Sequence, residues 1–184
     1  MTEKKITILG AGPGGYTAAF LAADRGMSVT LIDENFKPGG VCLHRGCIPS
    51  KSLLHFSRLI EETRNAEACG LKFQVPEIDL NRVREWNLEI INKMSNGLIS
   101  LCKQRGVKFV NGRARFLDGN NIIINDKDQL SFDHCILATG SQPICPPLFS
   151  EIGERTLTST SALELEEVPE RLLVVGGGYI GLEM

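Results

Sequence analysis

Apolar residues recur with two different periods along the first part of the chain. A β-branched run from Lys5 to Leu9 predicts a strand that ends at Gly10. Residues 16–25 are rich in Ala and Leu at helical spacing, and Gly26 is suited to cap that helix. The run from Ser28 to Asp33 predicts a second strand. A strand, a helix and a strand in this order form a right-handed crossover, so we expect a parallel sheet.

Two amphipathic helices and several short strands follow. Apolar residues return every three or four positions from Ser50 to Arg64 and again from Ile78 to Gln104, which predicts two helices. A short helix is expected at Ser161 to Glu167, and a buried strand at Leu172 to Val175. Beyond Gly106, turn residues separate the short strands that we predict at VKFV, ARFL, NIII and DHCILATG.

A proline-rich segment, SQPICPPLF, divides the chain, because it suits neither a helix nor a central strand. The pattern predicts an α/β fold. We expect residues 1–145 to form one domain with a parallel sheet and an added small β-meander. We expect residues 146–184 to form a linker and the truncated start of a second domain.

Composition narrows the classes of partner. The chain has 184 residues, 42% of them apolar, and a net charge of −2 with mixed signs, so we expect no nucleic-acid partner. It contains neither a signal peptide nor about 18 successive apolar residues, which predicts a cytoplasmic protein without a membrane partner. Its six cysteines should be mostly reduced thiols there. We expect Cys69, Cys102 and Cys135 to be buried core residues and Cys145 to be exposed.

A glycine fingerprint follows the first predicted strand and opens the first predicted helix. The glycines allow a tight bend, close approach of the backbone to a pyrophosphate and close helix packing, and the phosphates lie at the helix N-terminus. Asp33 would accept hydrogen bonds from an adenosine ribose, with Glu34 as the fallback. We therefore predict a dinucleotide site rather than a simple glycine-rich turn, and residues 1–145 are expected to be a Rossmann-like nucleotide-binding domain. The fingerprint comprises Gly10, Gly12, Pro13, Gly14 and Gly15.

A second fingerprint follows Leu172 to Val175 and comprises Gly176, Gly178 and Gly181. Two fingerprints suggest two cofactors, such as a flavin and a nicotinamide nucleotide. The sequence ends at Met184, before the strand and the acidic residue that would hold a ribose, so the second site is incomplete. We expect this tail to be poorly ordered or attached to the surface of the first domain.

The run GGVCLHRGCIPSK places Cys42 and Cys47 behind two glycines. At this spacing in an ideal helix their Cα atoms would lie about 9 Å apart, whereas a disulfide tolerates about 7 Å. Pairing therefore requires a break in the helix, which Gly46 and the Ile48-Pro49 step make plausible. Two unpaired thiols are the alternative. The spacing matches neither a thioredoxin motif nor a zinc site, and we predict no metal.

Taken together, GGVCLHRGCIPSK, the first fingerprint, ILATGS and VVGGGYIGLE closely resemble the class I pyridine nucleotide-disulfide oxidoreductases. The GCIPSK ending favours the dihydrolipoamide dehydrogenases over the glutathione and mercuric reductases. The resemblance implies FAD-dependent oxidation of protein-bound dihydrolipoamide with NAD. It also implies a lipoyl-domain partner from a 2-oxo-acid dehydrogenase or glycine cleavage complex, and a homodimer for the full-length chain.

The resemblance also implies residue roles. Cys42 would exchange with the substrate, Cys47 would lie beside the flavin ring, and Lys51 would stabilise reduced flavin and a thiolate. Val41 stands where the family usually has threonine, and the positive charge of His44-Arg45 would favour a thiolate on Cys42. The remaining implied FAD positions are Gly39, Gly40, Val41, Gly112, Ala138, Thr139 and Gly140, and the implied NAD positions are Gly176, Gly178 and Gly181.

The family's third FAD contact, most of its NAD domain and its C-terminal His-Glu pair are missing from the 184 residues. We therefore expect this piece to be unable to complete turnover, because the pair supplies the base for the dithiol. Two alternatives stay open: a non-catalytic FAD-binding fragment, and a related disulfide reductase of the glutathione or mercuric type.

Overall fold

The computed structural model describes residues 4–150, 153–164 and 166–184. The chain divides into two compact units. The first comprises the residues up to His44 together with Asn92–Ser141, and the second comprises Arg45–Ile91 with the residues from Gln142 onward. The domain boundary near residue 145 stays a prediction.

A four-stranded parallel sheet forms the centre of the first unit. Its order is β3 (Lys108–Asn111), β2 (Ser28–Asp33), β1 (Lys5–Leu9) and β7 (His134–Leu137). Helix α1 (Pro13–Asp24) connects β1 to β2. The bounds of β1 and β2 are those expected from the sequence, and the parallel pairing confirms the predicted α/β fold.

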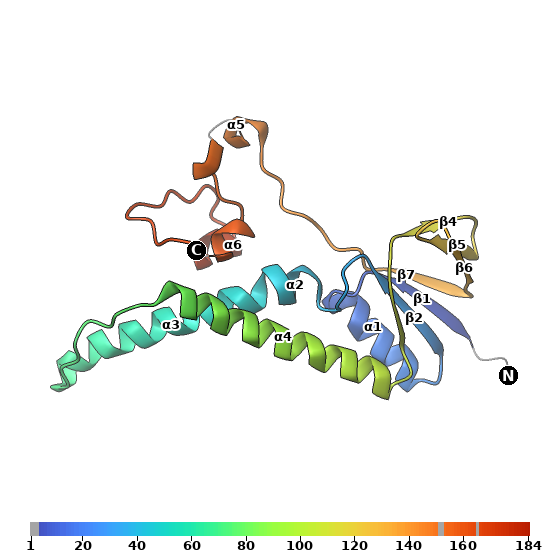
Figure 1. Cartoon of the computed structure of the whole chain (residues 1–184), viewed down its shortest axis with the longest axis horizontal. Coiled ribbons are helices and arrows are strands. Elements are labelled where there is room, and N and C mark those ends of the chain that lie inside the picture. Colours follow the sequence, from blue (N-terminus) through green and yellow to red (C-terminus); the bar gives the residue numbers. More distant parts are fainter. Residues whose placement is uncertain (1–3, 151–152, 165) are drawn as a thin grey trace. The chain divides into compact units, whose positions relative to one another are not determined.

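One face of this sheet packs against α1 and the last turns of α4 (Leu80–Gln104), as Figure 1 shows for α1. Side chains alternate between the two faces of a strand, so Ile6 and Ile8 of β1 point to this helical side. Small residues of α1, including Ala19, let the helix lie close to the strands. Cys102 of α4 is 2% exposed, as expected, and burial raises the pKa of its thiol, so the thiol stays protonated and unreactive.

The other face packs against a small antiparallel meander, which lies over the sheet in Figure 1. Its strands are β4 (Ala114–Phe116), β5 (Asn121–Ile124) and β6 (Asp128–Ser131). Ile122 and Ile124 of β5 pack against the sheet residues Leu9 and Ile32. Cys135 is half-buried beside this cluster. The meander is therefore the expected addition to the Rossmann-like sheet.

Helices dominate the second unit. In this unit α3 (Cys47–Asn65) runs beside the first turns of α4, where the rings of Phe56 and Trp86 meet edge to face with their centroids 5.7 Å apart. No helix in the described ranges is both long and apolar enough to cross a membrane. The remaining helical segments of the chain are α2 (Gly40–Arg45), η1 (Ala66–Cys69), α5 (Pro147–Ser150), η2 (Gly153–Arg155), η3 (Ser161–Glu164) and α6 (Tyr179–Glu183).

Helix ends differ from the sequence expectations at three places. Helix α1 begins at Pro13 and α3 at Cys47, each about one turn early, because proline is tolerated in a first turn where its missing N–H costs nothing. Helix α4 begins only at Leu80, because the Asp79 carboxylate accepts the N–H of Arg82 at 3.0 Å and so caps the helix.

Two expectations for buried segments were wrong. Residues Leu172–Val175 form no strand, and their exposed fractions lie between 42% and 85%. No strand pairing is found for them among the described residues, so they have no ladder of backbone hydrogen bonds. Cys69 is exposed rather than buried, because it ends the exposed segment η1. Of the helix predicted at Ser161 to Glu167, the structure has the short 3-10 helix η3 (Ser161–Glu164), and residue 165 lies outside the described residues.

Matched glycine substitutions test the packing of α1. A Cβ on the buried Gly15 would lie 1.7 Å from the Gly10 carbonyl oxygen, so Gly15→Ala should destabilise the fold by about 2–4 kcal/mol. Gly97 lies in α4 with no atom within 4 Å of an added Cβ, so Gly97→Ala should stabilise the fold by about 0.5–1 kcal/mol. Urea unfolding measures both changes, and equal effects would contradict the close packing.

Candidate functional site

The loop between β1 and α1 is built by contact of backbone with backbone. Gly10 has φ +98°, and a Cβ there would lie 2.1 Å from the carbonyl oxygen of Ala138, just beyond β7. The Gly15 position is closed in the same way by the Gly10 carbonyl. Side chains at these two positions would push the loop away from β7 and from α1. The first unit therefore brings Gly10, Gly15 and Ala138 together.

The N-terminus of α1 is left without a capping side chain. Gly12 is the N-cap residue, Pro13 follows it, and the first turn contains no acidic residue. The first N–H groups of the helix therefore have no partner within the helix, and the helix dipole favours negative charge there. Gly40 reaches the same turn, since a Cβ on it would lie 2.5 Å from Gly12 Cα and its φ is +61°. This bare concave turn fits a pyrophosphate.

Asp33 ends β2 beside this turn. Its half-buried carboxylate accepts the Ala11 N–H at 2.6 Å on one oxygen, and the Asn35 N–H and side-chain amide at 2.8 and 2.7 Å on the other. Because a carboxylate oxygen accepts two hydrogen bonds, the first oxygen can still accept a ribose hydroxyl. Glu34 is exposed and pairs with Arg113 at 3.5 Å. The residues present thus fit a nucleotide, with Asp33 better placed than Glu34.

The other FAD positions that the resemblance implies directly follow strands of the first unit. Gly112 follows β3, and a Cβ there would lie 2.6 Å from a methyl carbon of Ile124, so this glycine also serves the packing of the meander. Ala138 donates its N–H to the end of β1 at 2.8 Å. Thr139 and Gly140 follow it, and Gly140 has φ +73°.

The two motif cysteines lie on different helices. Cys42 is half-buried on α2 in the first unit, beside the exposed Val41, and Cys47 is the exposed first residue of α3 in the second unit. Gly46 separates the two helices with φ −150° and ψ −113°, so the motif is not one continuous helix. Both cysteines are thiols in this structure, and their pairing stays a prediction.

Lys51 has a carboxylate partner that the sequence analysis missed. Its ammonium donates to one oxygen of Glu183 on α6, and the Ser50 hydroxyl lies 3.1 Å from the other oxygen, all within the second unit. The hydrogen bond from Lys51, followed by that from Ser50, lowers the pKa of Glu183 below its usual range. Glu183 stands in the run VVGGGYIGLEM, which predicts only an incomplete nucleotide site and in which the sequence analysis assigns Glu183 no role.

The second fingerprint repeats part of the geometry of the first. Gly176 has φ +115°, Gly178 is the N-cap of α6, and a Cβ on Gly181 would lie 2.1 Å from the Gly176 carbonyl oxygen. This repeats the relation between Gly15 and Gly10. Among the described residues no strand leads directly into this turn, and no strand of either sheet comes from the segment around it.

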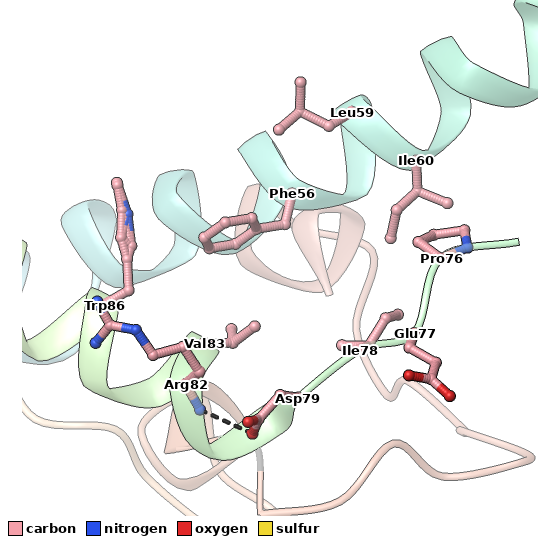
Figure 2. Close-up of a pocket in the computed structure, with 10 residues that line it drawn as sticks. All are labelled: Phe56, Leu59, Ile60, Pro76, Glu77, Ile78, Asp79, Arg82, Val83 and Trp86. Carbon is pink, nitrogen blue, oxygen red and sulfur yellow. Dashed lines mark hydrogen bonds between the residues drawn. The ribbon is translucent and has the colours of Figure 1, made fainter. Parts of the chain in front are cut away.

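A groove of about 470 Å³ lies within the second unit, between α3 and the loop that enters α4 (Figure 2). Mostly apolar side chains line it, and Asp79 at its edge is occupied in capping α4. None of the predicted site residues lines the groove, so we assign it no part in the chemistry. Its lining residues are Phe56, Leu59, Ile60, Pro76, Glu77, Ile78, Asp79, Arg82, Val83 and Trp86.

Comparisons with known proteins agree with this geometry. The family model described as pyridine nucleotide-disulphide oxidoreductase matches residues 4–184. The dihydrolipoyl dehydrogenase of Vibrio parahaemolyticus is 44% identical over 185 residues, and that of Bacillus subtilis 41%; each match covers 99% of this chain and 39% of the relative. The chain thus spans 39% of the length of these curated relatives.

A solved structure extends the comparison to the fold. The HOCl-induced flavoprotein disulfide reductase RclA from Escherichia coli superposes with a TM-score of 0.79 at 27% sequence identity. The match covers 97% of this chain and 38% of that one. The similarity in structure therefore includes the fingerprint loop, the cysteine helices and the meander.

The partners of Glu183 generate a pH prediction. In Lys51→Met the pKa of Glu183 should rise toward the ordinary glutamate value of about 4.3, and Ser50→Ala should raise it less. Because folding lowers this pKa, the interaction stabilises the second unit fully above the ordinary value and is lost as the pH falls through the lowered one. Carbon-13 NMR titration of the glutamate carboxyl groups measures the midpoint.

Arg58→Met is the matched control, because Arg58 pairs with Glu62 on the same helix at 2.7 Å. It removes a cation from α3 without touching Glu183. An unchanged Glu183 midpoint in Lys51→Met, or an equal shift in the control, would contradict the specific pairing.

Proposed function

The chain belongs to the pyridine nucleotide-disulphide oxidoreductase family, and on this premise we propose that it is the FAD and redox-disulfide part of a dihydrolipoyl dehydrogenase. One observation carries the proposal: the helix that bears Cys42 begins at Gly40, the residue packed against the fingerprint residue Gly12. Cys42 thus lies on the helix whose first residue packs against the turn that would hold the nucleotide. The relatives named dihydrolipoyl dehydrogenase are 41% and 44% identical to this chain, whereas the disulfide reductase is 27% identical. This difference supports a dihydrolipoyl group as the substrate.

FAD is the cofactor that we propose for the first fingerprint. The N–H groups at the start of α1 would hold its pyrophosphate, and the Asp33 carboxylate would accept a ribose hydroxyl. When bound, FAD supplies a two-electron acceptor that can pass the electrons on to a nicotinamide nucleotide. The residues Gly176, Gly178 and Gly181 would contribute to the site for that nucleotide, NAD.

Cys42 and Cys47 would carry out the exchange as a disulfide. One sulfur of the dihydrolipoyl group attacks Cys42, the Cys42–Cys47 bond breaks, and Cys47 leaves as a thiolate. The second substrate sulfur attacks the first, and the mixed disulfide breaks. Cys42 then leaves as a thiolate that keeps the electron pair of the broken bond. The substrate dithiol is thereby oxidised to a disulfide and the protein disulfide is reduced, with two protons released from the substrate.

The N-terminus of α3 suits the thiolate that this exchange leaves on Cys47. Cys47 is the first residue of a long helix, where the helix dipole stabilises negative charge. Lys51 lies one turn further along, on the same face of the helix. Glu183 holds the Lys51 ammonium in place, and this pairing fixes the cation near the start of α3. We propose that Lys51 stabilises both the Cys47 thiolate and the reduced cofactor.

The proposal for the whole protein extends beyond these residues, since the chain spans 39% of the length of its relatives. We propose a cytoplasmic homodimer that oxidises the lipoyl domain of a 2-oxo-acid dehydrogenase or glycine cleavage complex.

The visible absorption spectrum of the 184-residue chain, mixed with FAD and freed of excess, tests the proposed function. A yellow protein that gains a long-wavelength absorption on addition of dihydrolipoamide would support it, because the Cys47 thiolate would then lie against the flavin. A colourless protein with titratable thiols at Cys42 and Cys47 would overturn it. Bound FAD without any response to dithiol would favour the non-catalytic fragment, and a response to glutathione alone would favour the other reductases.

Serine substitutions separate the roles of the two cysteines. With FAD bound, Cys42→Ser should show the long-wavelength absorption without any reductant, because its Cys47 can no longer form the disulfide. Cys47→Ser should not show it under any condition, because the donor thiolate is gone. Cys145→Ser is the matched control, since Cys145 is exposed in the proline-rich segment, and its spectrum should equal that of the parent. The reverse pattern would exchange the assigned roles.

A further inference from the structure

The backbone carbonyl of Pro38 accepts hydrogen bonds from two different helices of the first unit. The His44 Nε2 atom of α2 lies 3.2 Å from this oxygen, and the Ser95 hydroxyl of α4 donates to it at 3.1 Å. Pro38 is among the fully buried residues, and Ser95 is 0% exposed. A buried carbonyl with two side-chain donors is a fixed point in the fold, because loss of both donors would leave it unsatisfied.

Neighbouring contacts hold the same segment in place. The Gly39 N–H donates to the Ala11 carbonyl at 2.8 Å, and the Lys37 ammonium lies 3.2 Å from the Asn92 side-chain oxygen. Gly39 has φ +137°, and a Cβ on it would lie 2.9 Å from His44 Nε2, so the imidazole lies directly against this glycine. The segment before α2 is thus tied to the fingerprint loop and to α4.

Helix α2 depends on such anchors. It has only six residues, and a helix of this length does not hold its conformation alone. Leu43, 4% exposed, anchors one side of it, and His44 anchors the end nearest the second motif cysteine. Cys42 lies on this helix between the fingerprint contact of Gly40 and the anchor at His44. The backbone that carries the Cys42 thiol is therefore fixed on both sides by these contacts.

We propose that His44 is a positioning residue for the thiol exchange: by donating to the Pro38 carbonyl, it holds α2 so that the Cys42 sulfur faces the attacking substrate sulfur. Ser95 holds the same carbonyl from α4. This inference rests on the proposed function for its purpose, and it assigns His44 the role of a hydrogen-bond donor rather than of a charge. Both the Nε2-protonated neutral ring and the imidazolium carry the required proton, so this clamp, the His44–Pro38 hydrogen bond, needs no charge on the ring.

Alkylation of the reduced 184-residue chain by iodoacetamide, followed at each thiol by peptide mass spectrometry, tests the inference. In His44→Leu the rate at Cys42 relative to Cys47 should rise about three- to tenfold, because α2 would open more often and expose the half-buried Cys42. Loss of one hydrogen bond corresponds to about this range. His44→Gln keeps an N–H donor at similar reach but carries no charge, and its ratio should stay within about twofold of the parent. If the charge of His44 were the cause, the Gln and Leu variants would behave alike, and that outcome would overturn the inference.

Two serine variants make the test independent of the histidine ring. Ser95→Ala removes the second donor to Pro38 and should shift the Cys42 to Cys47 ratio in the same direction. Ser100→Ala removes a hydroxyl donor from the same helix, where it bonds the Asn96 carbonyl at 3.0 Å, and should leave the ratio unchanged. If alkylation became faster by the same factor at both thiols in His44→Leu and Ser95→Ala, the variants would have destabilised the whole fold. That result would overturn the positioning role of His44.

The alkylation ratio tests the role of His44 and the flavin spectrum tests the proposed function, so either proposal can be overturned without the other. A shifted ratio in a chain whose flavin ignores dihydrolipoamide supports the His44 clamp while overturning the proposed substrate. An unchanged ratio in both Pro38-donor variants, in a chain whose flavin responds to dihydrolipoamide, overturns the clamp while supporting the proposed function.

Discussion

Contact between backbones that carry no side chains is the constraint on which the first unit depends. Gly10 lies against the carbonyl of Ala138, Gly15 lies against the carbonyl of Gly10, and Gly40 lies against Gly12. The first two contacts fix the sheet and α1 around one turn, and the third brings the start of the cysteine helix to it. Because these glycines carry no side chains, the N–H groups of that turn are also accessible to an anion. Fold and candidate site therefore share one physical cause.

In the second unit an ion pair, rather than close contact between glycine backbones, positions a candidate site residue. Lys51 follows Cys47 by one turn of α3, and the Glu183 carboxylate of the second fingerprint helix holds it. A paired lysine keeps its position at a smaller entropic cost during the reaction than a lysine that must first become ordered. The buried Ser50 adds a second hydrogen bond to the carboxylate, so the cation is held by a group that is itself oriented.

Local pattern was sufficient wherever local interactions decide the structure. The bounds of β1 and β2 followed from β-branched runs closed by turn residues, whereas the start of α1 at Pro13 did not, because apolar spacing begins later than the helix. Strand β6 was missed because DQLS has a single half-buried residue, Leu130. The segment Leu172–Val175 has strand composition, but within the described part of the chain it has no neighbouring strand. The partnership of Glu183 with Lys51 joins residues 132 positions apart, which no local pattern can indicate.

The order of the parallel sheet has a consequence for how the chain folds. Strand β1 at the start of the chain lies between β2 and β7, and the Asp133 side chain just before β7 bonds the Lys5 N–H across 128 positions. One edge of β1 therefore has no partner until most of the first unit has left the ribosome. Closing so long a loop is slow, because its entropy is lost before the contacts form. Until then the unpaired edge of β1 can pair with other chains, so nascent copies are exposed to aggregation through an edge that β7 covers in the folded chain.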